Sequence, residues 1–135
     1  MNAAKELLNQ GYTLAICLGE TVYTSKERGV KTLLSFVEGK IDVSGFYCAD
    51  RVVGKGATSL YVLLNVREVH ACVISKCAKE VLTNNCIKIS FDTEVDRIVS
   101  RDKTGYCPIE EAVININEPS LAYDAIKKKL LALRS

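Results

Sequence analysis

The sequence predicts one α/β domain that spans residues 1–135 and contains a mixed sheet with helices on both faces. Its 135 residues suit one hydrophobic core. The hydrophobic fraction of 48% is ordinary for a folded chain and too high for a disordered one. Apolar segments with strand-like and helix-like spacing alternate along the chain, and no repeat, linker or low-complexity segment interrupts them.

The N-terminal part is expected to form a helix, a hairpin and a second helix. Gly11 ends the first helix, and the nearly continuous apolar run after it is typical of a strand that is covered on both faces. Gly19 and Glu20 form a tight turn into the next strand. The expected elements are a helix over 3–10, strands over 12–18 and 21–24, and an amphipathic helix with Val30, Leu33, Leu34 and Val37 that ends at Gly39.

The middle of the chain is expected to be helical from Asp50 onward. Aspartate is a good N-cap residue, and apolar residues recur at helical spacing over 51–64. Gly54 and Gly56 fall inside this helix, where each glycine costs about 1 kcal/mol relative to alanine. Glycines in such positions indicate a close approach of the backbone to a sheet or to a ligand.

The rest of the chain alternates between strands and helices. Pro108 suits the first turn of a helix, and Asn117 is expected to cap the last helix. The expected elements are a strand over 68–75, a helix with Ala78, Val81 and Leu82, a fourth strand with Ile87, Ile89 and Phe91, a polar stretch over 92–104, a helix from Pro108, and a last helix with Ala122, Ile126, Leu130 and Leu133 inward and 127–129 in water.

Composition and charge exclude several classes of function. A net charge of +2 gives no footprint for nucleic acid, and the apolar runs over 14–18 and 60–64 are too short to cross a membrane. The N-terminus lacks the apolar core of a signal peptide. The six cysteines include no C-x-x-C pair, and His70, expected to be a hydrogen-bonded strand residue, is the only histidine. We expect a reduced, cytoplasmic protein without a metal or other cofactor.

Two groups of polar residues are candidates for a site. Gly54-Lys55-Gly56 lacks the spacing of a phosphate-binding P-loop. We therefore expect these residues to serve close helix packing, and a phosphate contact is the alternative. Asp50, as a helix cap, would stay ionised and could orient a ligand at a strand-to-helix junction. The alternative is that it only stabilises the helix.

The second group surrounds Pro108. Cys107 stands at a helix N-terminus, which lowers a thiol pKa and favours nucleophilic chemistry, whereas Glu110 and Glu111 in the first turn favour the thiol form. Arg101 could hold an anionic ligand or brace a turn. The alternative for Cys107 is a capping or buried thiol.

Three blocks of the sequence resemble a known family. They are Ala49-Asp50-Arg51-Val52-Val53-Gly54-Lys55, Val73-Ile74-Ser75 and Arg101-Asp102-Lys103-Thr104-Gly105-Tyr106-Cys107-Pro108-Ile109-Glu110. In order and spacing these blocks resemble an uncharacterised prokaryotic family, a domain of unknown function placed in the cytidine-deaminase-like fold. The resemblance implies a three-layer α/β/α sandwich with a mixed sheet that opens on a hairpin.

The resemblance also implies which chemistry is missing. Zinc deaminases of that fold place H-x-E or C-x-E at the start of one helix and P-C-x-x-C at the start of the next. Here the corresponding positions hold Asp50-Arg51-Val52 and Ser75-Lys76-Cys77, so the ligands of a catalytic zinc are absent. The protein is therefore not expected to be a zinc deaminase.

Three hypotheses about function follow. The first is that a small anionic or nucleotide-like ligand binds in the degenerate deaminase pocket. Its candidate residues are Asp50, Lys55, Ser75, Arg101, Cys107 and Glu110. The second is a metal-free transferase or hydrolase that uses Asp50 or Cys107. The third is a non-catalytic subunit whose helices pack on a partner or on a second copy of the chain.

Overall fold

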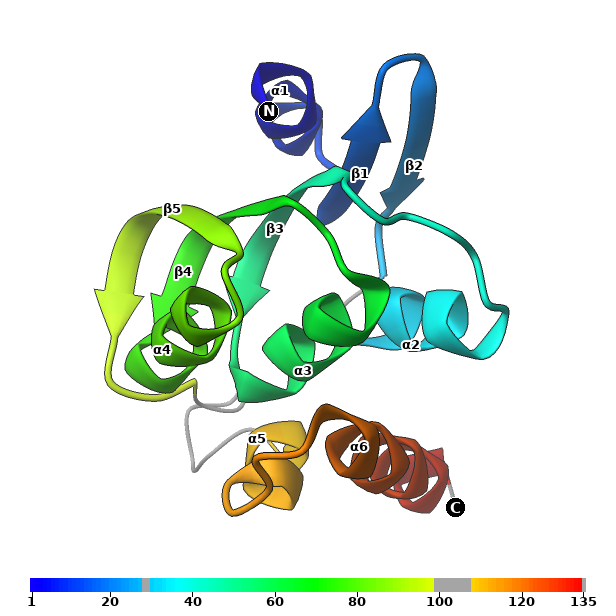
Figure 1. Ribbon diagram of the computed structural model, residues 1–135, viewed down its shortest axis with the longest axis vertical. Helices are drawn as coiled ribbons and strands as arrows, with labels where there is room; N and C mark the ends of the chain where they lie inside the picture. Colours follow the sequence, from blue (N-terminus) through cyan, green and yellow to red (C-terminus); the bar gives the residue numbers. More distant parts are fainter. Residues whose placement is uncertain (28–29, 99–107, 135) are drawn as a thin grey trace.

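The computed structural model describes residues 1–27, 30–98 and 108–134 (Figure 1). It contains five strands, β1 Leu14–Leu18, β2 Thr21–Ser25, β3 Tyr47–Val53, β4 Glu68–Ser75 and β5 Lys88–Val95. The helices in these residues are α1 Asn2–Asn9, α2 Lys31–Glu38, α3 Lys55–Leu64, α4 Lys76–Asn84, α5 Pro108–Val113 and α6 Pro119–Arg134.

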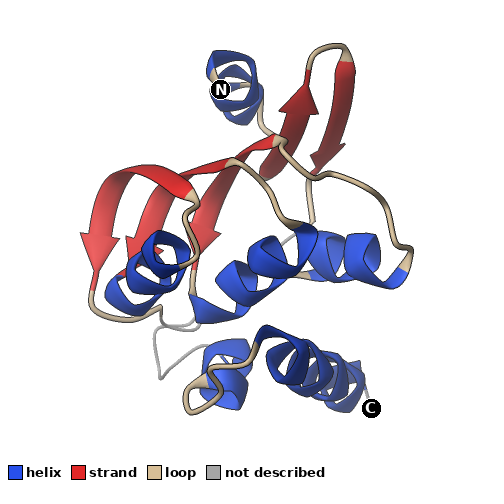
Figure 2. Ribbon diagram, in the orientation of Figure 1, coloured by secondary structure: helices blue, strands red, loops and turns tan. Residues whose placement is uncertain are grey.

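The strands form one mixed sheet in the order β2-β1-β3-β4-β5. The β1 strand is antiparallel to both of its neighbours, β2 and β3, whereas β3, β4 and β5 run parallel to one another. Helices lie on both sides of this sheet, as Figure 2 shows. The predicted α/β class with a mixed sheet is confirmed.

The two faces of the sheet are covered unequally. The α1 helix lies on one face, where its Ala4 and Leu8 pack against Ala15, Cys17 and Ala49. The larger core lies on the other face, beneath α2, α3 and α4, and α5 and α6 pack in turn against α3 (Figure 1). The α3 helix is therefore enclosed between the sheet and the C-terminal helices.

The segment from Tyr47 to Leu64 differs from the prediction. Asp50 does not cap a helix; it lies in the middle of β3, opposite Leu14 of β1 and Ala71 of β4. The α3 helix begins only at Lys55, after an extended Gly54. The apolar residues from Ala57 onward form the expected face of a helix, whereas Tyr47–Val53 form a central strand. The sheet therefore has five strands instead of the four that the sequence indicated.

Two further boundaries differ. The β5 strand continues to Val95, into a stretch expected to be polar loop, because its outer residues pair with β4 while their side chains stay in water. The last helix begins at Pro119, so Asn117 is not its cap. The expected inward residues Ala122 and Ile126 are fully buried.

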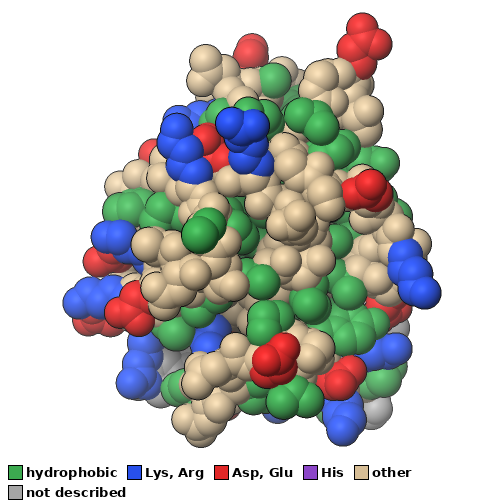
Figure 3. Space-filling view, in the orientation of Figure 1, with side chains coloured by type: hydrophobic (Ala, Val, Ile, Leu, Met, Phe, Trp, Pro, Cys, Tyr) green, Lys and Arg blue, Asp and Glu red, His purple; other side chains and the backbone are tan. Residues whose placement is uncertain are grey.

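The surface has no marked preference for one sign of charge on the face seen in Figure 3, where basic and acidic side chains are interspersed. Among the described residues, no helix is long and apolar enough to cross a membrane.

Candidate functional site

The start of α3 holds a carboxylate that comes from α5. The backbone N–H of Lys55 donates to Oε1 of Glu110 over 2.7 Å, and the N–H of Gly56 donates to Oε2 over 2.9 Å. The first N–H groups of a helix have no partner inside the helix, and the helix dipole favours negative charge there. The Glu110 side chain thus closes an anion-binding site at the N-terminus of α3.

The two glycines around Lys55 are explained by this contact. A Cβ atom on Gly54 would overlap the Glu110 carboxyl group, and one on Gly56 would lie 2.9 Å from Cγ2 of Ile109. The sequence indicated a close backbone approach at these glycines, and the structure shows that the approaching group is α5.

Lys55 makes the reciprocal contact. Its ammonium group donates to the carbonyl oxygen of Ile114 over 3.0 Å and to Oδ1 of Asn117 over 3.4 Å. Ile114 directly follows α5, so the cation lies at the negative end of that helix. The side chain of Lys55 is buried, and only 7% of the residue is exposed. The Glu110 carboxylate therefore binds the start of α3, and the Lys55 ammonium binds the end of α5, so the two helices are joined at two points.

Ser75 lies at the same edge of the sheet. Its hydroxyl caps α4 by accepting the N–H of Ala78 over 3.2 Å. Because Val53 pairs with Ile74 in the parallel β3–β4 ladder, Gly54 and Ser75 follow neighbouring strand ends. This is the edge where ligands of open α/β sheets bind.

Asp50 does not lie at that edge. Its side chain points toward α3, where Oδ2 accepts the hydroxyl of Tyr61 over 2.7 Å. Burial raises the pKa of Asp50 to about 7, although the Tyr61 hydroxyl and the N–H groups of Val52 and Arg51 act in the opposite direction. Burial also raises the pKa of Tyr61, which is fully enclosed. The half-buried Asp50 carboxyl is thus hydrogen-bonded to a fully buried tyrosine of α3.

Three of the candidate residues are therefore brought together at one edge, namely Lys55, Ser75 and Glu110, while Asp50 is set back along β3. Arg101 and Cys107 lie outside the described residues, and so do the other residues of their block up to Cys107.

A second polar cluster lies on the opposite face of the sheet. His70 Nδ1 is 2.8 Å from the hydroxyl oxygen of Ser90, and His70 Nε2 is 3.6 Å from Oδ1 of Asp92. Burial lowers the pKa of His70, which favours the neutral ring. The expectation that His70 is a hydrogen-bonded strand residue is confirmed. Its partners were missed because the β4–β5 register, which sets His70 beside Ser90, is not visible in the sequence.

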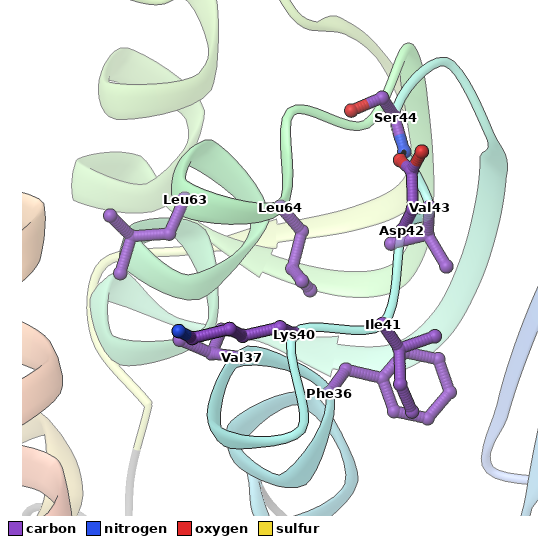
Figure 4. A pocket seen from close by; sticks show the side chains of 9 residues that line it. All are labelled: Phe36, Val37, Lys40, Ile41, Asp42, Val43, Ser44, Leu63 and Leu64. Carbon is purple, nitrogen blue, oxygen red and sulfur yellow. Dashed lines mark hydrogen bonds between the residues drawn. The ribbon is translucent and has the colours of Figure 1, made fainter.

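A surface pocket of about 290 Å³ lies elsewhere, at the C-terminal ends of α2 and α3 (Figure 4). Its lining residues are Phe36, Val37, Lys40, Ile41, Asp42, Val43, Ser44, Leu63 and Leu64. Leu63 and Leu64 end α3, whereas Lys55 begins it, so the pocket and the Glu110 contact lie at opposite ends of the helix. None of the candidate residues that the structure describes lines this pocket.

The described cysteines Cys17, Cys48, Cys72, Cys77 and Cys86 carry free thiols. Burial raises the pKa of Cys17, Cys48 and Cys72, which makes these thiols poor nucleophiles. In the part of the chain that the structure describes, no three His, Cys, Asp or Glu side chains lie in a group that could hold a metal ion.

Comparison with known proteins places the chain in a family. The model of a domain of unknown function, DUF1893, matches residues 2–130. The protein belongs to the DUF1893 family. A crystal structure of a DUF1893 family protein from Thermotoga maritima has a TM-score of 0.86 and 24% sequence identity. The alignment covers 95% of this chain and 87% of the Thermotoga chain, which shows that the two share a fold. No curated protein matches the sequence.

The expected membership of a family of unknown function is thus supported. The family match itself assigns no activity.

Proposed function

We propose that this DUF1893 protein binds a small anionic, nucleotide-like ligand at the N-terminus of α3, and that an anionic group of the ligand replaces the Glu110 carboxylate. One observation carries the proposal: the N–H groups of Lys55 and Gly56 already hold an anion, with both of its oxygens engaged. A phosphate group offers oxygens of the same kind and carries more charge. Helix N-termini bind phosphate by this arrangement of N–H groups and dipole.

The surroundings of the Glu110 contact support a ligand of this class. When Glu110 leaves, α5 loses one of its two attachments to α3, and the Lys55 ammonium keeps the other through Ile114 and Asn117. The Ser75 hydroxyl follows the neighbouring strand. Paired amide donors at a helix N-terminus suit a phosphorylated ligand. The cytidine-deaminase-like assignment of the fold, without zinc chemistry, is part of this proposal and not one of its supports.

The test compares two adjacent glutamates of α5. Glu110 holds the α3 amides, whereas Glu111 is exposed and serves as the matched control. Wild type, Glu110→Gln and Glu111→Gln would be titrated calorimetrically with inorganic phosphate, pyrophosphate and nucleoside mono- and diphosphates. A charge-assisted hydrogen bond contributes about 1.5–3 kcal/mol, so removal of the internal competitor should tighten binding roughly tenfold or more.

We expect Glu111→Gln to bind as the wild type does. If neither wild type nor folded Glu110→Gln binds any of these compounds, or if both glutamate variants bind with equal affinity, the proposal is wrong and Glu110 is only a helix cap.

The metal-free transferase or hydrolase stays a prediction. Asp50 is engaged by Tyr61 and is set back from the sheet edge, and Cys107 lies outside the described residues. The anion-binding proposal is favoured because two of its candidate residues, Lys55 and Glu110, are hydrogen-bonded to each other.

A further inference from the structure

Within the described residues, β5 has a strand neighbour on one side only. The sheet order ends at β5, which lies at the left-hand edge of the sheet in Figure 1. The strand is eight residues long and contains no proline. Such an edge presents unpaired N–H and C=O groups and can accept a further strand.

One hydrogen bond fixes which backbone groups point outward. The N–H of Lys88 donates over 3.2 Å to the carbonyl of Arg67, the residue just before β4. Because the direction of the backbone groups alternates along a strand, Ser90 also points its N–H and C=O toward β4. Ile89 and Phe91 therefore direct theirs to the open side.

The side chains of this part of β5 are also divided between two faces. Ser90 and Asp92 contact His70 on the face that carries α1, and Lys88 pairs with Glu68 there over 3.7 Å. Phe91 lies on the opposite face, where the ammonium of Lys79 from α4 is 5.2 Å from the ring centroid.

From these two patterns we infer that a second copy of the chain adds to β5 as an antiparallel strand, with the twofold axis at Ser90. Ile89 of each copy then lies opposite Phe91 of the other, and both residues present outward backbone groups that can exchange hydrogen bonds. The apolar Ile89 and Phe91 side chains share the α4 face. The two five-stranded sheets become one continuous sheet.

Charge selects this register over its neighbours. With the axis at Ser90, Lys88 of each copy lies opposite Asp92 of the other on the same face, and both side chains are largely exposed, at 81% and 66%. An axis at Phe91 would set Lys88 opposite Glu94, which points to the other face because it contacts Lys79 of α4. An axis at Asp92 would place two aspartates against each other.

The experiment is a charge exchange read by analytical ultracentrifugation. The wild type should sediment as a concentration-dependent dimer. Lys88→Asp places an aspartate opposite Asp92 of the other copy, and Asp92→Lys places a lysine opposite Lys88 of the other copy. Because like charges across an interface are strongly unfavourable, each variant alone should dimerise at least about tenfold more weakly. An equimolar mixture of the two variants should form a heterodimer, because one Lys88–Asp92 pair then keeps its native sign and the other re-forms with reversed sign.

The controls are Lys128→Asp and Asp124→Lys, which make the same charge changes at exposed positions of α6. These variants should sediment as the wild type does. A wild type that stays monomeric at the highest soluble concentration overturns the inference, and so does a dimer that neither β5 variant weakens. Failure of the mixture to dimerise also overturns it, provided that both variants melt cooperatively as folded proteins.

Discussion

The α3 helix meets two carboxylates, and their surroundings give them opposite properties. Glu110 lies at the first turn, where two backbone N–H groups and the helix dipole stabilise its charge. Asp50 lies beside Tyr61 later in the helix, where a single hydroxyl is its side-chain partner and burial raises its pKa to about 7. Asp50 also accepts hydrogen bonds from the N–H groups of Arg51 and Val52, so the number of donors does not explain its raised pKa. The comparison teaches that loss of hydration can outweigh several hydrogen bonds to a carboxylate.

The largest effect is expected from Gly54→Ala, which forces the Glu110 carboxylate away from α3. The new methyl group takes the place of the carboxyl group, so the flexible Glu110 side chain must move away and two charge-assisted hydrogen bonds are lost. We expect the free energy of unfolding to fall by roughly 3–5 kcal/mol, measured by urea denaturation.

Gly56→Ala should cost less, because its methyl group meets Ile109 and lies at ordinary contact distance from the Glu110 carboxylate, which keeps its hydrogen bonds, and because alanine favours the helix. Gly54→Ala combined with Glu110→Ala should be less destabilising than the sum of the single changes. Equal losses for the two glycines, or strict additivity in the double variant, would contradict the assigned contact.

Asp50→Asn should remove a pH dependence of stability. The pKa of Asp50 is about 7 in the folded protein and near 3.8 in the unfolded chain, so between these values the folded state binds the extra proton. The contribution of protonated Asp50 to the free energy of unfolding is fully present below about pH 4 and is lost as the pH rises through 7. Between pH 5 and pH 8, the wild type should lose about 2–3 kcal/mol relative to Asp50→Asn.

Thermal or urea unfolding at several pH values measures this difference, and Asp124→Asn on exposed α6 is the control. A constant difference between wild type and Asp50→Asn from pH 5 to pH 8 would show that Asp50 does not titrate in this range.

Glu110→Gln should destabilise the protein without introducing a methyl group at position 54. The glutamine oxygen can still accept one N–H, but its amide group cannot accept the other. We expect a loss of about 2 kcal/mol in the free energy of unfolding, and a loss within about 0.5 kcal/mol for exposed Glu111→Gln. A Glu110→Gln protein as stable as the Glu111 variant would mean that the α3 amides do not depend on the Glu110 charge.

The smallest effect is expected from Tyr61→Phe, which removes one hydroxyl and keeps the ring. The Tyr61 hydroxyl lowers the pKa of Asp50, so its loss should move the pH-dependent loss of stability to higher pH. At pH 5, where Asp50 is protonated, the cost should be about 1 kcal/mol. A pH profile identical to that of the wild type would separate Tyr61 from the titration of Asp50.

The sequence predicted the elements whose residues interact locally. The amphipathic α2 helix, the β1–β2 hairpin and the β4–α4 unit follow from apolar spacing and glycine turns. The β3 strand was missed because its centre carries Asp50 and Arg51, which resemble the start of a helix. A polar residue in a central strand is accommodated here only because Tyr61 lies opposite Asp50, and that contact exists only in the folded protein.

The candidate site was predicted only in part for a similar reason. Gly54 and Gly56 indicated a close approach of the backbone, and Glu110 was a candidate residue. The hydrogen bonds between them, however, span 54 and 55 positions of the sequence. No local pattern reports such a pairing. The His70–Ser90 contact likewise depends on strand register, which the alternation of polar and apolar residues does not fix.

The attachment of Glu110 to α3 also has a consequence for the order in which the chain becomes native during synthesis. The strands and the helices α1 to α4 are all encoded before residue 96. The amides that open α3 acquire their native acceptor only from residue 110, and the Lys55 ammonium acquires its acceptors from 114 and 117. When the complete sheet has emerged from the ribosome, the hydrogen-bond partners of α3 have therefore not yet been synthesised or exposed. That helix becomes fully hydrogen-bonded only when the C-terminal part of the chain emerges.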